Sequence, residues 1–245
     1  MRTIFQSTVL SIFLSVTGVA VYSEENENEY SDGLKSTLKG LGTSLSEIAS
    51  TPVAGVFEIE APDGNILYVT EDGKHVFTGE LHSIEGTKTR NLTEERRSHA
   101  RRELMAGLTM DETLNFAPTG NTEHIVYAFT DVDCGFCRTL HDNIEGYGAE
   151  GIEIRYLAYP RAGTKSETYK KMVSAWCATD PNDAITKLKE GEPIKRENCD
   201  NPIASHMELG RKLKISGTPT LILESGRVIP GYLPPDRLKQ ALANE

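Results

Sequence analysis

The sequence predicts an α+β protein built from a small N-terminal unit and a larger C-terminal unit. Residues 53–79 hold three short apolar segments separated by turn sequences that contain Asp-Gly, a pair typical of tight hairpins. From residue 122 onward, strand-like segments alternate with helical ones. Between them, residues 91–105 have helical propensity but almost no apolar stripe, which is typical of a helix that connects domains through solvent.

The first 23 residues have the pattern of a secretory signal peptide. Arg2 precedes an uncharged stretch from Ile4 to Tyr22, and an acidic segment follows. The stretch is short and has no basic flank on its far side, so a cleaved signal is favoured over an uncleaved membrane anchor, which stays the alternative. We therefore expect residues 1–23 to be removed and the chain to be exported to an oxidising compartment, which suits its four cysteines.

The charge balance argues against one class of partner. The chain has 26 Lys and Arg against 36 Asp and Glu, and its basic residues form no extended stripe. Nucleic-acid binding needs such a positive surface, so no nucleic-acid partner is expected.

Residues 24–88 are expected to form the N-terminal unit. Apolar residues between Leu34 and Ile48 recur every three to four positions, which predicts a short amphipathic helix broken near Gly40. Three strands are expected next, at residues 53–60, 66–70 and 75–79. A core this small is marginal alone, so we expect dimerisation, with an edge strand near residues 75–80 as one place for pairing. A self-sufficient accessory domain is the alternative.

Residues 89–118 are expected to form a linker helix and loop, and residues 119–245 the C-terminal domain. Asn91 and Glu94 have the spacing of a helix-capping box. The C-terminal elements expected, in order, are a strand at 125–129, a helix from Cys134, a strand at 152–159, helices at 166–177, 181–190 and 202–214, strands at 220–224 and 227–230, and a helix from 235. This order is the one that a thioredoxin fold with a helical insertion produces.

A Cys-x-x-Cys motif, Cys134 and Cys137, stands where a strand turns directly into a helix. The first thiol then lies at the helix N-terminus, where unpaired N–H groups and the positive end of the dipole favour a thiolate. Cys137 is one turn further on, close enough to form a disulfide with Cys134, so the pair can cycle between dithiol and disulfide. A zinc site and an inert structural disulfide are the alternatives; no second close cysteine pair supports zinc, so neither metal nor cofactor is expected.

Two further features bear on the chemistry. Pro219 stands just before a β segment, where a cis peptide bond would expose the backbone of Thr218 to a partner strand; a trans bond is the alternative. Cys177 stands at a helix end and Cys199 in the loop before the next helix. Neither has activating neighbours in the sequence, so we expect a structural rather than a reactive role for them.

These motifs together resemble the DsbC/DsbG family of periplasmic protein disulfide isomerases. The likeness is carried by Pro52-Val53-Ala54-Gly55, residues 67–75, Phe129-Thr130-Asp131, Cys134-Gly135-Phe136-Cys137, Leu140-His141, residues 155–161, Trp176-Cys177-Ala178, Ser216-Gly217-Thr218-Pro219 and Pro230-Gly231-Tyr232. The resemblance implies a V-shaped homodimer of N-terminal domains, with linker helices and thioredoxin-like catalytic domains facing an uncharged cleft. It also implies that Pro219 is cis beside the active pair and that Cys177 and Cys199 are bridged.

The resemblance implies thiol-disulfide exchange on misoxidised protein substrates. Cys134 would attack a non-native disulfide and Cys137 would resolve the mixed disulfide, with the substrate chain lying along Thr218 and Pro219. A membrane thiol reductase of the DsbD type would restore the dithiol. The alternatives are a DsbG-like reductase of single oxidised cysteines, a dimeric holdase chaperone, and a monomeric DsbA-like oxidant, which the N-terminal domain disfavours.

The chain departs from the family pattern at several positions. Phe136 replaces the usual tyrosine between the cysteines, and Arg138 stands where a histidine is common, so a permanent cation is expected to favour a thiolate against two nearby aspartates. Ala128 stands where thioredoxins carry a buried acid, so proton removal from Cys137 needs another group or water. His141 is expected to be a helix-surface or packing residue rather than a catalytic base.

Overall fold

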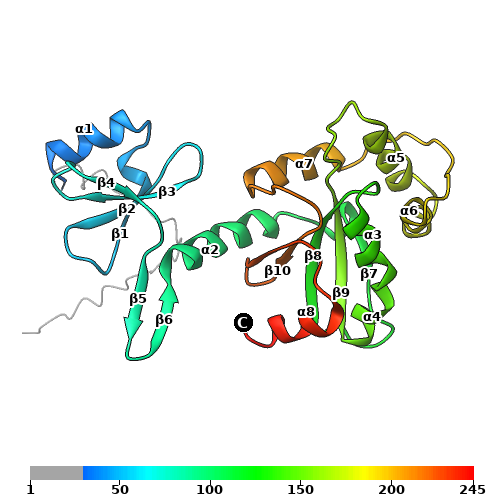
Figure 1. Cartoon of the computed structure of the whole chain (residues 1–245). Helices are drawn as coiled ribbons and strands as arrows, with labels where there is room; N and C mark the ends of the chain where they lie inside the picture. Colours follow the sequence, from blue (N-terminus) through cyan, green and yellow to red (C-terminus); the bar gives the residue numbers. More distant parts are fainter. Residues whose placement is uncertain (1–29) are drawn as a thin grey trace, which may run out of the picture. The chain divides into compact units, whose positions relative to one another are not determined.

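The computed structural model describes residues 30–245, so the expected signal peptide lies outside the described residues. The chain divides into two compact units after Gly79 (Figure 1). Within the described part, no helix is both long and apolar enough to span a bilayer.

The first unit is a helix packed on a four-stranded antiparallel sheet. Its elements are α1 (Asp32–Gly40), a 3-10 turn η2 (Leu45–Glu47), β1 (Ile48–Ser50), β2 (Val56–Glu60), β3 (Ile66–Thr70) and β4 (Val76–Thr78), with the strands adjacent in that order. Leu34 and Leu38 from α1 are buried against Ile59 and Val69 of the sheet, which forms the small core. The outer strand β4 is an edge, and β1 is a strand that the sequence pattern did not reveal.

The tight turns of this unit follow the predicted Asp-Gly sequences. Gly73 has φ of 70°, a backbone conformation that side chains disfavour. A Cβ atom there would also collide with the backbone of Gly33 in α1. The second hairpin turn therefore needs glycine both for its backbone angle and for the close approach of the helix.

The second unit begins with a polar hairpin and the long helix α2. The hairpin consists of β5 (His82–Glu85) and β6 (Lys88–Asn91), and α2 runs from Leu92 to Ala106. The Asn91 side chain accepts a hydrogen bond from the amide of Glu94 at 2.9 Å, so the predicted N-cap is present. Arg101 donates to Glu94 at 2.6 Å and to the carbonyl of Gly226 at 3.2 Å. The helix is therefore fastened to a later turn of the same unit rather than solvated all round.

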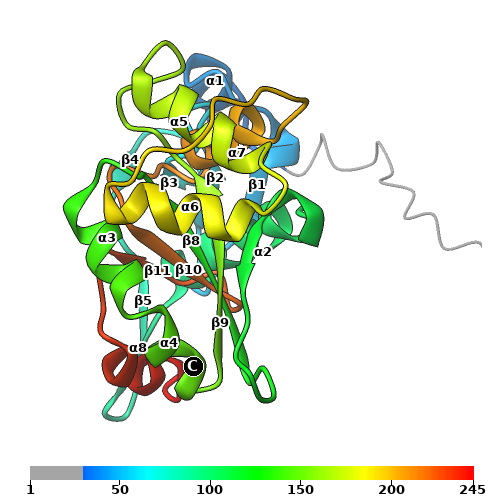
Figure 2. The same cartoon turned by 90° about the vertical axis from the view of Figure 1, so that its right-hand side faces the viewer.

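A five-stranded mixed sheet forms the centre of the second unit (Figure 2). Its strands are β7 (Leu114–Phe116), β8 (His124–Thr130), β9 (Ile152–Ala158), β10 (Thr220–Leu223) and β11 (Val228–Pro230), in the spatial order β11-β10-β8-β9-β7. Only β8 and β9 are parallel among these pairs. The helices are α3 (Gly135–Asp142), α4 (Ile144–Ala149), α5 (Glu167–Trp176), α6 (Pro181–Glu190), α7 (Ile203–Lys212) and α8 (Pro235–Leu242), and η3 (Met110–Glu112) precedes β7.

Both faces of this sheet are covered. Val126 and Ala128 of β8 face a core formed largely by α3, α4, α5, α6 and α8, whereas Phe129 faces a second core that includes Met105 of α2 and Leu213 after α7. Burial on both faces explains why β8 reads as a continuous apolar run. The expected α+β class and thioredoxin-like order of elements are confirmed, while β7 and the β5–β6 hairpin had no clear signal in the sequence.

Two covalent features of the unit bear on the site. Cys177 and Cys199 form a disulfide of 2.02 Å that joins the end of α5 to the loop before α7, so it encloses the segment that carries α6. The peptide bond between Thr218 and Pro219, just before β10, is cis.

Candidate active site

Cys134 and Cys137, the two free cysteines, lie at the start of α3, directly after the end of β8. Cys134 is the N-cap residue of α3, and its thiol donates a hydrogen bond to the carbonyl of Thr218 at 3.2 Å. This loop before β10 comes 84 residues later in the chain, so the fold brings the Cys-x-x-Cys motif and the cis-proline loop together.

The two thiols have opposite pKa shifts. Burial raises the pKa of Cys134, but the side chain of Thr218, hydrogen bonds from Cys137 and the charge of Arg161 outweigh burial and lower that pKa below its usual value. Burial dominates at Cys137, which is fully buried, and raises its pKa. Cys134 is therefore the thiol that ionises more readily, and Cys137 is the one that holds its proton more strongly.

The hydroxyl of Thr218 is buried beside both sulfur atoms. It has no conventional hydrogen-bond partner, and it acts to lower the pKa of Cys134 and of Cys137. A hydroxyl without an oxygen or nitrogen partner is available to donate to whichever sulfur carries the negative charge. The sequence pointed to Thr218 only for its backbone, so this use of its side chain was missed.

Asp131 places a cation beside the nucleophile. Its buried carboxylate accepts hydrogen bonds from both the backbone amide and the Nε of Arg161, each at 3.0 Å, and from the amide of Asp133 at 2.8 Å. These contacts fix the loop before Cys134 and hold Arg161 where its charge stabilises the thiolate. Sequence reasoning did not single out Arg161, because the residue lies after β9, far from the motif in the chain.

Arg138 has a different use from the one expected. Its Nε donates to the carbonyl of Val132 at 3.0 Å, and its guanidinium lies 3.6 Å from the carboxylate of Asp133. Burial raises the pKa of Asp133, but bonds from Thr168 and Lys171 and the charge of Arg138 outweigh this effect and lower it. The charge of Arg138 is thus largely balanced by Asp133, and Arg161 is the cation that lowers the pKa of Cys134.

His141 is a packing residue, as the sequence analysis favoured. Its Nδ1 lies 3.1 Å from the hydroxyl of Tyr156 and its Nε2 lies 2.9 Å from the hydroxyl of Thr186. Thr186 donates its own hydrogen to Asn182, so Nε2 must carry the ring proton and Nδ1 must accept from Tyr156. Burial, with a contribution from Lys189, lowers the pKa of His141 to about 4, so the ring is neutral and engaged at both nitrogens.

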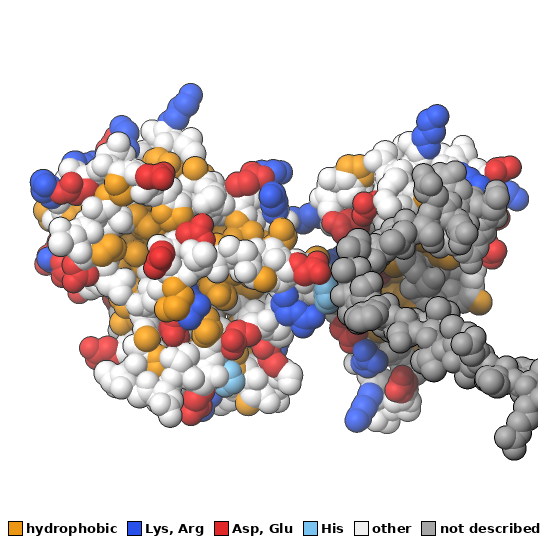
Figure 3. All heavy atoms as spheres, turned by 180° about the vertical axis from the view of Figure 1, so that it is seen from behind, with side chains coloured by type: hydrophobic (Ala, Val, Ile, Leu, Met, Phe, Trp, Pro, Cys, Tyr) orange, Lys and Arg blue, Asp and Glu red, His pale blue; other side chains and the backbone are white. Residues whose placement is uncertain are grey.

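Phe136 is the exposed member of the motif. Its side chain is 68% exposed between two buried cysteines, so an apolar ring stands next to the nucleophile. In Figure 3, apolar and charged side chains are interspersed over one face of this unit, with a broad apolar area among the charges. An approaching chain therefore meets apolar as well as charged surface on this unit.

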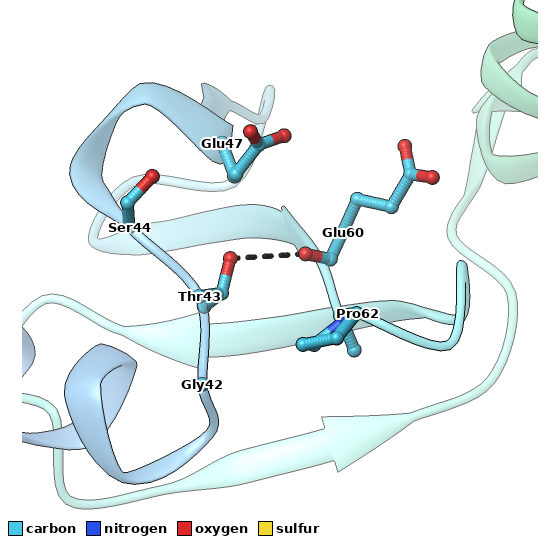
Figure 4. A pocket seen from close by; sticks show the side chains of 7 residues that line it. Gly42, Thr43, Ser44, Glu47, Glu60 and Pro62 are labelled. Carbon is cyan, nitrogen blue, oxygen red and sulfur yellow. Dashed lines mark hydrogen bonds between the residues drawn. The ribbon is translucent and has the colours of Figure 1, made fainter.

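One hollow outside this site offers no comparable chemistry. A hollow of about 450 Å³ in the first unit is lined by residues 42–44, Glu47 and residues 60–62, and Thr43 donates there to the carbonyl of Glu60 at 3.0 Å (Figure 4). It contains no thiol, histidine or cation. Residues 30–245 also hold no cluster of ligands suited to a metal ion.

Comparisons with known proteins match both parts of the chain to known families. Residues 22–94 match the family described as the disulfide bond isomerase protein N-terminal domain, and residues 111–244 match the thioredoxin-like domain family. The thiol:disulfide interchange protein DsbC of Escherichia coli K12 is 37% identical over 209 residues, covering 85% of this chain and 86% of the relative. The chain belongs to the DsbC family. DsbC of Haemophilus influenzae is 34% identical over 216 residues, covering 85% of this chain and 88% of that protein.

A solved structure extends the comparison to the fold of part of the chain. The crystal structure of a disulfide interchange protein from Neisseria gonorrhoeae is 29% identical, with a TM-score of 0.50, and covers 56% of this chain and 97% of that chain. This DsbC-family chain is thus a thiol-disulfide oxidoreductase whose Cys-x-x-Cys pair, Cys134 and Cys137, lies in a thioredoxin-like domain.

Proposed function

We propose that this chain isomerises or reduces non-native disulfides in exported proteins, with Cys134 as the nucleophile and Cys137 as the resolving thiol. The observation that carries the proposal is the opposite pKa shift of the two thiols beside the cis-proline loop. An isomerase needs one sulfur ready to attack and a second that waits.

The first half of the reaction forms a mixed disulfide. The thiolate of Cys134 attacks one sulfur of a substrate disulfide, a new S–S bond forms, and the other substrate sulfur leaves as a thiolate. The substrate segment lies extended beside Thr218 and Pro219, where it adds main-chain hydrogen bonds as an additional strand would. Because proline has no N–H, Pro219 leaves the neighbouring backbone of Thr218 to make those contacts.

The second half decides between two outcomes. If another substrate thiol attacks the mixed disulfide, Cys134 is released as a thiolate and the substrate disulfide has been rearranged. If Cys137 attacks Cys134 instead, the substrate leaves reduced and the active pair is oxidised. A membrane thiol reductase of the DsbD type then returns the pair to the dithiol.

The domain plan completes the proposal. Residues 1–23 act as the export signal to the periplasm, 24–88 as the dimerisation domain, 89–118 as the linker and 119–245 as the catalytic domain. Strand β4 supports a homodimer, since it is an unpaired edge whose Val76 and Phe77 are 41% and 44% exposed. Pairing of two such edges across a two-fold axis would bury both side chains.

Trapping tests the proposal directly. A Cys137→Ala variant that is exported to the periplasm should accumulate mixed disulfides between Cys134 and proteins that contain several cysteines, because resolution by Cys137 is blocked. A Cys134→Ala variant is the matched control and should trap nothing. Equal trapping by both variants, or none by either, would contradict the assignment of Cys134.

The alternatives within the same architecture are a DsbG-like reductase of single oxidised cysteines and a dimeric holdase chaperone. Refolding of a scrambled protein with several disulfides should be lost when Cys134 and Cys137 are both replaced by serine, whereas suppression of aggregation should persist to the extent that the dimer acts as a holdase. A double variant that keeps its full refolding activity would exclude an isomerase.

A further inference from the structure

A lysine is buried behind the active pair. Lys189 lies in the last turn of α6, and it is only 2% exposed. Lysine is almost never buried this completely unless it is paired with a carboxylate. Its position is therefore unusual and needs a reason.

The partners of Lys189 are neutral. Its Nζ donates to the hydroxyl of Thr130 at 2.7 Å and lies 3.4 Å from the carbonyl of Cys137. It also stands 4.9 Å from the centre of the Tyr156 ring, a cation–π contact. Within residues 30–245, Lys189 has no carboxylate at ion-pair distance. Burying an ammonium without a counter-ion costs stability, so packing alone does not account for a lysine at this position.

These contacts lead to the sulfur of Cys137. The hydroxyl of Thr130 also acts to lower the pKa of Cys137. An ammonium can only donate, so Thr130 must accept from Lys189, which leaves the single hydroxyl hydrogen of Thr130 for Cys137. The charge of Lys189 is also the strongest of the effects that oppose the burial of Cys137.

We propose that Lys189 is a positioning residue for the second half of the reaction: acting through the hydroxyl of Thr130, its ammonium stabilises the thiolate of Cys137 and sets the rate at which a mixed disulfide is resolved. This role rests on the proposed function, in which Cys137 is the resolving thiol. Ala128 occupies the position where thioredoxins carry a buried acid. In this chain the buried charged group that assists Cys137 is instead the ammonium of Lys189.

The step balances without an additional reactant. Cys137 loses its proton, and the thiolate, stabilised by Thr130 and Lys189, attacks the sulfur of Cys134. The S–S bond between the two cysteines forms while the bond from Cys134 to the substrate breaks. The electron pair leaves on the substrate sulfur, which takes up one proton, so the substrate is reduced and the pair is oxidised. Lys189 keeps its proton throughout.

The charged groups around Lys189 keep it cationic at neutral pH. Burial lowers the pKa of Lys189 to about 8, against the two active cysteines and Asp131, which raise it, while Arg138 lowers it further. His141, on the adjacent helix α3, is neutral and adds no charge. The ammonium is thus present when the enzyme works and is lost under alkaline conditions.

The two thiols can be followed separately with an aromatic disulfide, dithiobis-nitrobenzoate, added to the reduced full-length protein. Attack by Cys134 releases one coloured thiolate, and attack by Cys137 on the resulting mixed disulfide releases a second. A Cys137→Ala variant should show the first phase only, which assigns the phases. The pH dependence of the second phase then reports the pKa of Cys137.

Lys189→Met removes the charge and keeps a long apolar side chain. We expect the pH midpoint of the second phase to rise by about 1–3 units, the effect of a close opposite charge on a pKa. Each unit by which the pKa of Cys137 rises leaves tenfold less thiolate at a pH below the midpoint. The thiolate also becomes roughly threefold more nucleophilic for each unit, so the second phase should slow by about threefold per unit. The first phase should change much less.

Two further variants make the result decisive. Lys187→Met removes an exposed lysine from the same helix turn, where it pairs with Asp183 at 2.6 Å, and it should leave the second phase unchanged. Thr130→Val should raise the midpoint, and adding it to Lys189→Met should have little further effect, because both act on one path. An unchanged midpoint in Lys189→Met would overturn the role of Lys189. Absence of the first phase in the wild type would instead refute the proposed function.

Discussion

Acid stability of the catalytic unit should depend on one buried histidine. His206, in α7, is fully buried, and its Nδ1 accepts a hydrogen bond from the amide of Ala158 at 3.1 Å. Burial lowers the pKa of His206 to about 4, against a smaller opposite effect of Glu112. A proton on Nδ1 would also face the Ala158 N–H and break the bond. The folded state therefore holds this ring neutral at a pH where the unfolded chain protonates it.

The sign and size of the effect follow from the two pKa values. Above about pH 6.5, His206 is neutral in both states and contributes no pH dependence. Between pH 6.5 and about 4, the unfolded chain binds a proton that the folded unit does not, so the free energy of unfolding falls as the pH falls. A difference of 2.5 units at about 1.36 kcal/mol per unit gives a loss of roughly 3 kcal/mol across this window.

The substitution His206→Asn isolates this contribution. Asparagine can still accept from Ala158 but does not titrate, so the variant should lose roughly 3 kcal/mol less than the wild type between about pH 7 and pH 4. Trp176, the one tryptophan of the chain, has its ring centre 6.2 Å from that of His206 and reports unfolding of this unit in urea. His99→Asn, at an exposed position of α2, is the control. Parallel pH profiles for wild type and His206→Asn would refute the reasoning.

Three other outcomes are expected. Lys189→Met should raise the free energy of unfolding at neutral pH by roughly 3 kcal/mol. This gain should shrink as the pH rises from about 8 to 10.5, because Lys189 of the folded wild type loses its proton in that range before Lys189 of the unfolded chain does. Urea unfolding that shows no gain would contradict the cost assigned to burial. Replacing both Cys177 and Cys199 by serine should lower the free energy of unfolding by about 3 kcal/mol, the chain-entropy estimate for a loop of 22 residues. The first phase with the aromatic disulfide should stay intact. Unfolding curves that coincide with those of the wild type would contradict a stabilising role of this disulfide. Phe77→Lys should place a charge on the exposed edge strand β4 and give monomers in sedimentation, and a variant that stays dimeric would exclude pairing through this edge.

The sequence predicted the elements whose signals are local. The apolar run of β8 ends at the Cys-x-x-Cys motif, and the Asn91 cap marks the start of α2, because neighbouring residues alone determine both features. Strand β7 escaped notice, since it is three residues long and exists only through its pairing with β9, about 40 residues later in the chain. Short strands whose partners are distant carry little information in their own residues.

The charges of the active site were harder to predict. The sequence favoured Arg138 because it is adjacent to Cys137, but its nearest acid is Asp133, whereas Arg161 comes from another loop. Lys189 did leave a signal: it stands four residues after Ile185, so helical spacing places it on the buried face of α6. A lysine in the last turn of a helix is usually solvated near the helix C-terminus, and that expectation concealed it.

The near burial of Cys134 has a consequence for which proteins the enzyme can act on. Only 4% of this residue is exposed, and the cis-proline loop lies against its sulfur. We therefore expect a substrate disulfide to reach the sulfur of Cys134 only when the segment that carries the disulfide is extended and detached from its own structure, as in a chain that has not finished folding. Disulfides inside completed folds are held away by the packing around them, so we expect shape and mobility to select the target.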